Sequence, residues 1–154
     1  MVDDLAAKLV EKGVDGLFVD NCDVYYHYQN KGTFDGLTTI LKGFKSQGAY
    51  VVINGGDEYV RTYAKRNGTL DAVMDAVNQE TVFSKIEWDT DSFSENPKSE
   101  RDYFKSYVEL CDKKGCDVFL LEYTTDSSVK RKIRKYCKSK GYNYYISDSL
   151  ELGV

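Results

Sequence analysis

Histidine and proline each occur once in the 154 residues, and no apolar run approaches the roughly 20 residues that cross a bilayer. We therefore expect no membrane span. The four cysteines form no C-x-x-C pair and have only His27 as a companion, which excludes a His/Cys metal site. We expect no metal and no cofactor, and we expect the four thiols to be buried or idle. With a single proline, no low-complexity tract and no linker, residues 1–154 are predicted to form a single domain.

The chain also carries no large excess of charge of either sign. The formal net charge is −4, and acidic and basic residues are mixed along the chain, so the basic field that nucleic-acid binding needs is missing. We expect no nucleic-acid partner, and a cationic or neutral ligand is easier to accommodate. Residues 1–8 lack the basic and apolar regions of a signal peptide, so we expect no export or anchoring signal in this chain, and the compartment stays open.

Four short apolar strand candidates each run into an acidic or amide residue. They are residues 16–21, 50–56, 75–80 and 117–123, and the polar residues at their ends are Asp20, Asn54, Glu80 and Glu122. In parallel α/β sheets the catalytic groups lie at the carboxyl ends of the strands, where the loops meet. This recurrence therefore predicts one shared cleft.

Apolar residues at helical spacing occupy the intervals between these strands. The predicted helices span residues 3–12, 33–45, 57–66, 97–114 and 127–140, and a fifth strand spans residues 142–147. Residues 84–95 are predicted to be irregular and to form an acidic, solvated lid. Strands that alternate with helices are parallel and joined by right-handed crossovers, so the predicted fold class is α/β with parallel βα repeats and about five strands.

Five strands suit an open sheet, whereas eight close a (β/α) barrel. In two of the strands the terminal acid has a small or polar residue behind it on the same face. Gly16, Phe18 and Asp20 share this face in the first strand, and Ala76, Asn78 and Glu80 share it in the third. Such residues behind a terminal acid suit the crowded interior of a barrel better than the branched apolar face of an open sheet. A partial barrel is therefore favoured, with the open sheet as the alternative.

Four segments of the chain are similar to a known family. They are residues 13–25, 51–56, 77–83 and 141–148, and they include a Gly-Val-Asp-Gly-Leu-Phe-Val-Asp motif and an Asn-Gln-Glu motif. The sequence resembles the endo-α-1,4-polygalactosaminidase family of TIM-barrel glycoside hydrolases and the related cysteinyl-tRNA-synthetase-like extracellular barrel proteins. The resemblance extends over essentially the whole chain. It implies that residues 1–154 are the C-terminal portion of a TIM-barrel glycoside hydrolase domain.

The resemblance implies cleavage of an α-1,4-galactosaminide type of amino-sugar polysaccharide by two acids. These are Asp20, assigned as the nucleophile, and Glu80, assigned as the acid/base. One carboxyl group must protonate the leaving oxygen, and the other must attack the anomeric carbon or activate water. The family is typically extracellular.

Other polar or aromatic residues at or just after strand ends are candidates for binding sugar hydroxyls or an amino group. These substrate-binding candidates are Asp23, Tyr25, Asn54, Glu122 and Tyr123. The alternative for each is a loop-capping or solvated role.

Relative to a full barrel the first three βα units are missing, because Met1 begins where the third helix is expected. This predicts an N-terminal truncation, a homo-oligomer or partner chain that covers the open barrel face, or a rearranged five-stranded sheet. The functional alternative to hydrolysis is a catalytically inactive barrel that serves as a carbohydrate-binding or oligomerising module. A nucleotide-binding or signalling sheet is less favoured, because the last strand ends in Ser147-Asp148 without a lysine.

Overall fold

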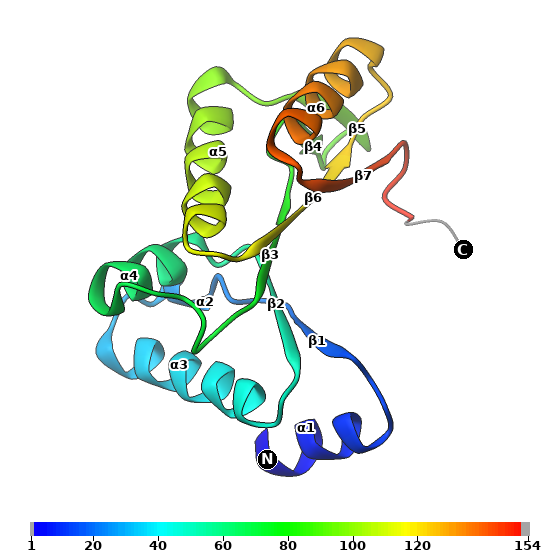
Figure 1. The fold of residues 1–154 in the computed structure, drawn as a ribbon. Coiled ribbons are helices and arrows are strands. Elements are labelled where there is room, and N and C mark those ends of the chain that lie inside the picture. Colours follow the sequence, from blue (N-terminus) through cyan, green and yellow to red (C-terminus); the bar gives the residue numbers. More distant parts are fainter. Residues whose placement is uncertain (1, 152–154) are drawn as a thin grey trace. The chain divides into compact units, whose positions relative to one another are not determined.

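The computed structural model describes residues 2–151, and its helices and strands follow the alternating order predicted from the sequence (Figure 1). Five strands form one sheet in the order β1-β2-β3-β6-β7. They are β1 (Gly16–Val19), β2 (Tyr50–Asn54), β3 (Ala76–Glu80), β6 (Asp117–Tyr123) and β7 (Asn143–Ser147). β1 pairs with β2 and β6 pairs with β7, in both cases in parallel. The predicted α/β fold with parallel βα repeats, of the partial-barrel type, is confirmed.

The chain divides into two compact units. The first unit comprises residues 2–77 and 110–117, and the second comprises residues 78–109 and the chain from residue 118 onward. Each unit has a core of its own, because buried apolar side chains occur on the strands and helices of both. The prediction of a single domain over residues 1–154 stays a prediction.

The first unit contains four helices around β1 and β2 (Figure 1). They are α1 (Val2–Glu11), α2 (Val24–His27), α3 (Lys31–Ser46) and α4 (Asp57–Asn67). α3 begins after Asn30, whose side chain accepts a hydrogen bond from the backbone N–H of Thr33 at 2.9 Å and so satisfies one of the unpaired amides of the first turn. α3 packs against α1, α2 and β2, and α2 also packs against α4.

Alternation along β2 decides which side chains enter the core of the first unit. Val51 and Ile53 are fully buried, whereas Tyr50 is 37% exposed. The parallel register places Phe18 of β1 beside Val52 of β2. Since side chains in register project to the same face, position 20, directly after β1, and position 54, the last residue of β2, have their side chains on one side of the sheet.

The second unit contains the helices α5 (Lys98–Lys113) and α6 (Ser127–Lys140), together with a two-stranded antiparallel sheet of β4 (Ser84–Glu87) and β5 (Ser92–Glu95). α6 begins after Asp126, whose carboxylate accepts hydrogen bonds from the backbone N–H groups of Ser128 and Val129. Glu109 of α5 accepts a hydrogen bond from the Tyr136 hydroxyl at 3.1 Å and pairs with Lys140 at 3.1 Å, which joins the two helices.

One prediction about local structure was wrong. Residues 84–95 are not irregular, because Ser84–Glu87 and Ser92–Glu95 pair as a β-hairpin. After β1, Val24–His27 forms a short helix, since Asn21 takes a left-handed conformation (φ 59°) and turns the chain directly after the strand.

The cysteines are as predicted. Cys22, Cys111, Cys116 and Cys137 are all free and buried. Burial raises the pKa of the Cys22 thiol to about 12 and that of Cys116 to about 11, with neighbouring carboxylates adding to the effect, so these thiols stay protonated and unreactive at neutral pH. Within residues 2–151, none of the helices has the length and apolar character required to span a membrane.

Candidate active site

In the first unit, the ends of β1 and β2 bring Asp20 and Asn54 together. The side-chain amide of Asn54 donates a hydrogen bond to Asp20 Oδ1 at 3.1 Å, and the backbone N–H of Asn21 donates to the same oxygen at 2.8 Å. Asp20 is exposed. The pair therefore holds the carboxylate in a defined orientation and leaves it open to solvent.

Asp23 lies next to this pair but supports the backbone. Its Oδ1 accepts a hydrogen bond from the N–H of Gly56 at 2.8 Å. Gly56 precedes α4 as its N-cap and has φ 71°, a left-handed conformation in which glycine is favoured. Asp23 thus fixes the turn that follows β2, which is the loop-capping role that the sequence left open for it.

We expect Gly56→Ala to lower the free energy of unfolding by about 3 kcal/mol, because a Cβ combines left-handed strain with a clash. That atom would lie 2.9 Å from Cβ of Cys22 and 3.1 Å from Cγ2 of Ile53. Gly68→Ala is the matched control, since Gly68 has φ 79° and an added methyl group there would have no neighbour within 4 Å, so only the strain remains. Urea unfolding of both variants measures the difference, and equal losses would contradict the close contact.

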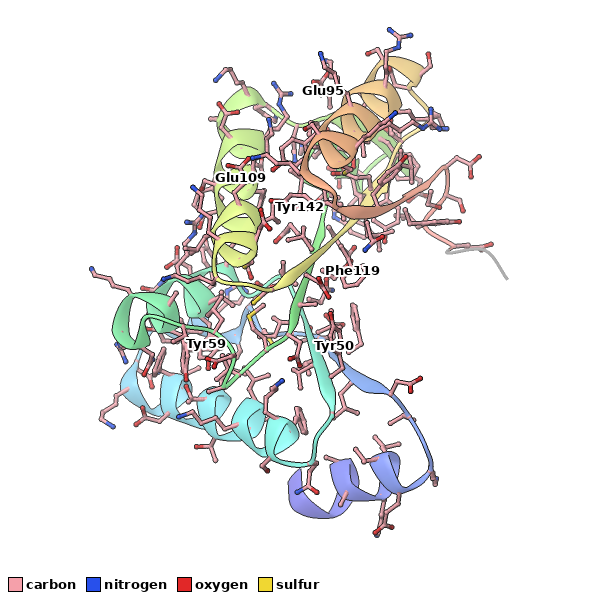
Figure 2. All side chains as sticks on the ribbon, viewed as in Figure 1. Tyr50, Tyr59, Glu95, Glu109, Phe119 and Tyr142 are labelled. Carbon is pink, nitrogen blue, oxygen red and sulfur yellow. The ribbon has the colours of Figure 1, made fainter. Side chains whose placement is uncertain are left out.

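Tyr25 is placed in the core of the first unit. It is only 7% exposed, and its ring centroid lies 5.6 Å from that of Phe34 and 6.3 Å from that of Tyr59, which Figure 2 labels. Such edge-to-face contacts stabilise an aromatic core. The short helix α2 directs this side chain into the core, so Tyr25 anchors the segment that follows β1.

In the second unit, the ends of β3 and β6 bring Glu80 and Tyr123 together. The Tyr123 hydroxyl donates a hydrogen bond to Glu80 Oε2 at 3.1 Å. Burial, with the charge and hydrogen bond of Glu80, raises the pKa of Tyr123 to about 12, so the hydroxyl remains a donor across the physiological pH range. The ring of Tyr123 stacks on Phe93 of β5, with centroids 6.1 Å apart. Glu80 is thus oriented by a side chain that the hairpin itself holds.

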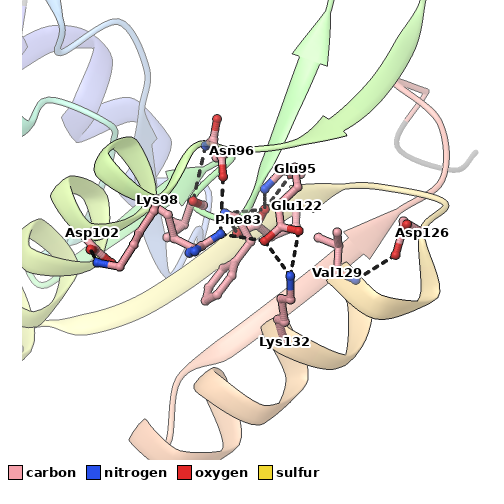
Figure 3. Close-up of polar contacts among 12 residues, drawn as sticks. Phe83, Glu95, Asn96, Lys98, Asp102, Glu122, Asp126, Val129 and Lys132 are labelled. Atoms are coloured by element: carbon pink, nitrogen blue, oxygen red, sulfur yellow. Dashed lines mark hydrogen bonds and ion pairs between the residues drawn. The ribbon is translucent and has the colours of Figure 1, made fainter.

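Glu122 is adjacent to Tyr123 on β6 but projects to the opposite face, because successive side chains alternate along a strand. It is fully buried. Its carboxylate accepts hydrogen bonds from the backbone N–H groups of Phe83 and Ser84 and from the Ser84 hydroxyl, the last at 2.6 Å (Figure 3). Burial raises the pKa of Glu122 to about 7, an effect that these hydrogen bonds oppose. Glu122 therefore fixes the start of β4 from a fully buried position.

The hairpin β4–β5 is the part of the site that the sequence prediction missed. The end of β5 is fixed beside the start of β4 by Asn96, which is 4% exposed and donates from Nδ2 to the carbonyl of Thr81 at 2.6 Å. Glu95 pairs with Arg101 of α5 at 2.6 Å and with Lys132 of α6 at 2.7 Å (Figure 3). The hairpin is therefore fixed at the end opposite its turn, where Ser84 pairs with Glu95, and by both helices of the second unit.

A sequence signal for this hairpin exists. Residues 84–87 and 92–95 each carry one apolar side chain among polar ones, Ile86 and Phe93, and the four residues Trp88-Asp89-Thr90-Asp91 separate the two segments. The turn places Trp88 at the tip with 70% of its surface exposed. No group of three or more His, Cys, Asp or Glu side chains suited to a metal ion occurs among the residues whose placement is described.

Comparison with protein-family models gave no match, and comparison with curated proteins gave none either. Solved structures do match. The glycoside hydrolase domain of PelA from Pseudomonas aeruginosa is similar with a TM-score of 0.73 and 23% sequence identity, over 99% of this chain and 61% of that one. A variant of the same domain, with one glutamate replaced by alanine, matches with a TM-score of 0.73 and 22% identity over the same shares.

This likeness establishes the fold. Almost the whole of the present chain superimposes on a glycoside hydrolase domain, so its βα repeats follow that domain's architecture. The chain spans 61% of the length of the domain that it matches.

Proposed function

We propose that this chain acts as a glycoside hydrolase on an amino-sugar polysaccharide of the α-1,4-galactosaminide type. Asp20 serves as the nucleophile and Glu80 as the acid/base. The observation that supports this most is the placement of both carboxylates at carboxyl ends of strands in a fold shared with a glycoside hydrolase domain. Substrate type and residue roles come from the family resemblance of the sequence.

The surroundings of the two carboxyl groups suit these different roles. Asp20 is exposed and accepts hydrogen bonds from two amide groups, which hold its carboxylate in one orientation. Glu80 is half-buried and receives one phenolic hydrogen bond from Tyr123. Asn54 orients Asp20 and Tyr123 orients Glu80, so both act as positioning residues.

Release of reducing ends from purified polymers tests the proposal. We expect the wild-type chain to cleave α-1,4-linked polygalactosamine, to act more slowly on its fully N-acetylated form, and to leave an α-1,4-glucan intact, because the glucan lacks the amino group. Absence of new reducing ends from every polymer would contradict the hydrolase assignment. Retention on a polygalactosamine column without cleavage would favour the inactive carbohydrate-binding module instead.

A further inference from the structure

The helix α6 concentrates the positive charge of the chain. Seven of the 21 basic residues and none of the 25 acidic residues lie between Ser127 and Lys140. The rest of the chain is therefore strongly acidic. Residues 130–135, Lys-Arg-Lys-Ile-Arg-Lys, form a short basic run of the kind that binds polyanions.

Four of these basic side chains form one stripe on the solvent side of α6. The inner side of the helix is defined by three buried residues, Val129, Ile133 and Cys137. The opposite side carries basic residues three and four positions apart, and residues at this spacing share a face. We call these four exposed residues the basic face, and they are Arg131, Arg134, Lys135 and Lys138.

The basic face has no acidic partner among residues 2–151. Lys132, beside the basic face, pairs with Glu95 (Figure 3), and Lys140 pairs with Glu109. Within the described part of the chain, no ion pair or hydrogen bond reaches the charged groups of the basic face itself. Like charges four residues apart, such as Arg131 and Lys135, repel each other and destabilise a helix. The fold therefore carries a repulsion that an anionic ligand relieves.

The composition of the basic face favours a narrow acidic polymer over other anionic partners. It contains no apolar side chain, whereas a helix that inserts into a membrane surface has an apolar side and a stable protein interface has an apolar core. It contains no aromatic ring on which the bases of single-stranded nucleic acid stack. It is one helix wide in an otherwise acidic chain, so a broad duplex or bilayer brings its own negative charge close to acidic residues.

We infer that the basic face of α6 is a docking surface for an acidic polysaccharide whose successive sugars carry negative charges. Successive turns of the helix place the charges of the basic face about 5 Å apart along its axis, which is close to the length that one pyranose residue adds to a linear chain. The two arginines can each bind a carboxylate through two parallel hydrogen bonds. The inference goes beyond the proposed function and does not depend on it, because it concerns a helix face and not the strand ends.

Fluorescence anisotropy of end-labelled oligosaccharides tests the inference on the full chain. The probes are a galacturonate octamer, which has one carboxylate on each sugar, a heparin octasaccharide, which also has sulfates, and neutral maltooctaose. We expect saturable binding of the acidic probes that weakens steeply as the salt concentration rises, and no binding of maltooctaose. The relative affinity of the two acidic probes distinguishes a preference for carboxylate from one for sulfate.

Two variants that lose the same charge test the position of the docking surface. The first carries Arg131→Gln, Arg134→Gln, Lys135→Gln and Lys138→Gln together. The second replaces exposed lysines that are scattered over four other helices, and it carries Lys8→Gln, Lys42→Gln, Lys65→Gln and Lys113→Gln. We expect the first variant to bind the acidic probes at least about 30-fold more weakly than the wild type, and the second to stay within about twofold.

Several results would overturn the inference. Equal weakening by the two variants would place the binding elsewhere on the chain, and failure of the wild type to bind either acidic probe would remove it altogether. Tighter binding of single-stranded oligodeoxythymidine, or of vesicles containing phosphatidylserine, than of both acidic probes would assign the basic face to nucleic acid or to a membrane. Loss of binding in the first variant alone, with the acidic probes preferred, supports the docking surface.

Discussion

Chains carrying Asp20→Asn or Glu80→Gln are expected to release reducing ends from polygalactosamine about 10³-fold more slowly than the wild type, because an amide of the same shape neither attacks carbon nor transfers a proton. The assay compares initial rates at equal protein concentration, with far-ultraviolet circular dichroism to show that the fold is retained. Asp35→Asn and Glu109→Gln are matched controls. They change the same types of residue at helical positions away from the strand ends, and their rates should equal that of the wild type.

The two roles can be separated with an aryl α-galactosaminide whose leaving group departs without protonation. Glu80→Gln should recover the first step on this substrate and release one equivalent of phenol rapidly, whereas Asp20→Asn should not. Unchanged turnover of the polymer by both variants would remove these residues from the mechanism. Rapid phenol release by Asp20→Asn alone would reverse the assignment of the roles.

Replacement of Glu122 by alanine should lower the free energy of unfolding by about 3 to 5 kcal/mol, since it leaves a cavity and removes the acceptor of three buried donors. The donors are the backbone N–H groups of Phe83 and Ser84 and the Ser84 hydroxyl. Asp102→Ala is the control, because the ion pair of Asp102 with Lys98 lies exposed on the surface of α5 and its removal should cost far less. Urea denaturation at neutral pH measures both, and equal losses would contradict the anchoring role of Glu122.

The same carboxyl group makes stability depend on pH in a defined direction. Its folded-state pKa of about 7 lies above the ordinary value of 4.5, so between these two values the folded protein holds a proton that the unfolded chain has released. The contribution of this proton to the free energy of unfolding is therefore fully present below pH 4.5. It is lost as pH rises through 7, by about 3 kcal/mol in total. Glu122→Gln should remove this component from the pH profile, and a profile identical to that of the wild type would contradict the raised pKa.

The sequence predicted the parallel sheet because its signals are local. Apolar runs such as residues 50–53 can only be buried strands between helices, and glycines such as Gly68 and Gly141 end the helices in the left-handed conformation that glycine adopts readily. The hairpin was missed because its strands are four residues long and mostly polar. Their pairing is stabilised by Glu122, which is distant from both strands in sequence, and by Asn96, which follows β5 but binds the carbonyl of Thr81 ahead of β4.

The site was predictable in part. Asp20 with Asn54, and Glu80 with Tyr123, are in contact because the carboxyl ends of neighbouring parallel strands lie side by side, a rule that needs only the order of the strands. Glu122 and Tyr123 differ by one position, and the face that each occupies depends on the register of β6, which the sequence alone does not define. Tyr25 is buried because the left-handed conformation of Asn21 turns the chain into α2. The burial depends on tertiary packing, which the sequence alone does not reveal.

Hydrolysis in ¹⁸O-labelled water tests the central claim most directly, because it asks whether a water oxygen becomes part of the product. The account predicts that the oligosaccharides released from polygalactosamine by the wild-type chain gain one ¹⁸O atom at the anomeric carbon of each new reducing end, as read by mass spectrometry. It also predicts that Glu80→Gln forms labelled product about 10³-fold more slowly than the wild type. Products without the label, or labelled products formed equally by the wild type and Glu80→Gln, would contradict it.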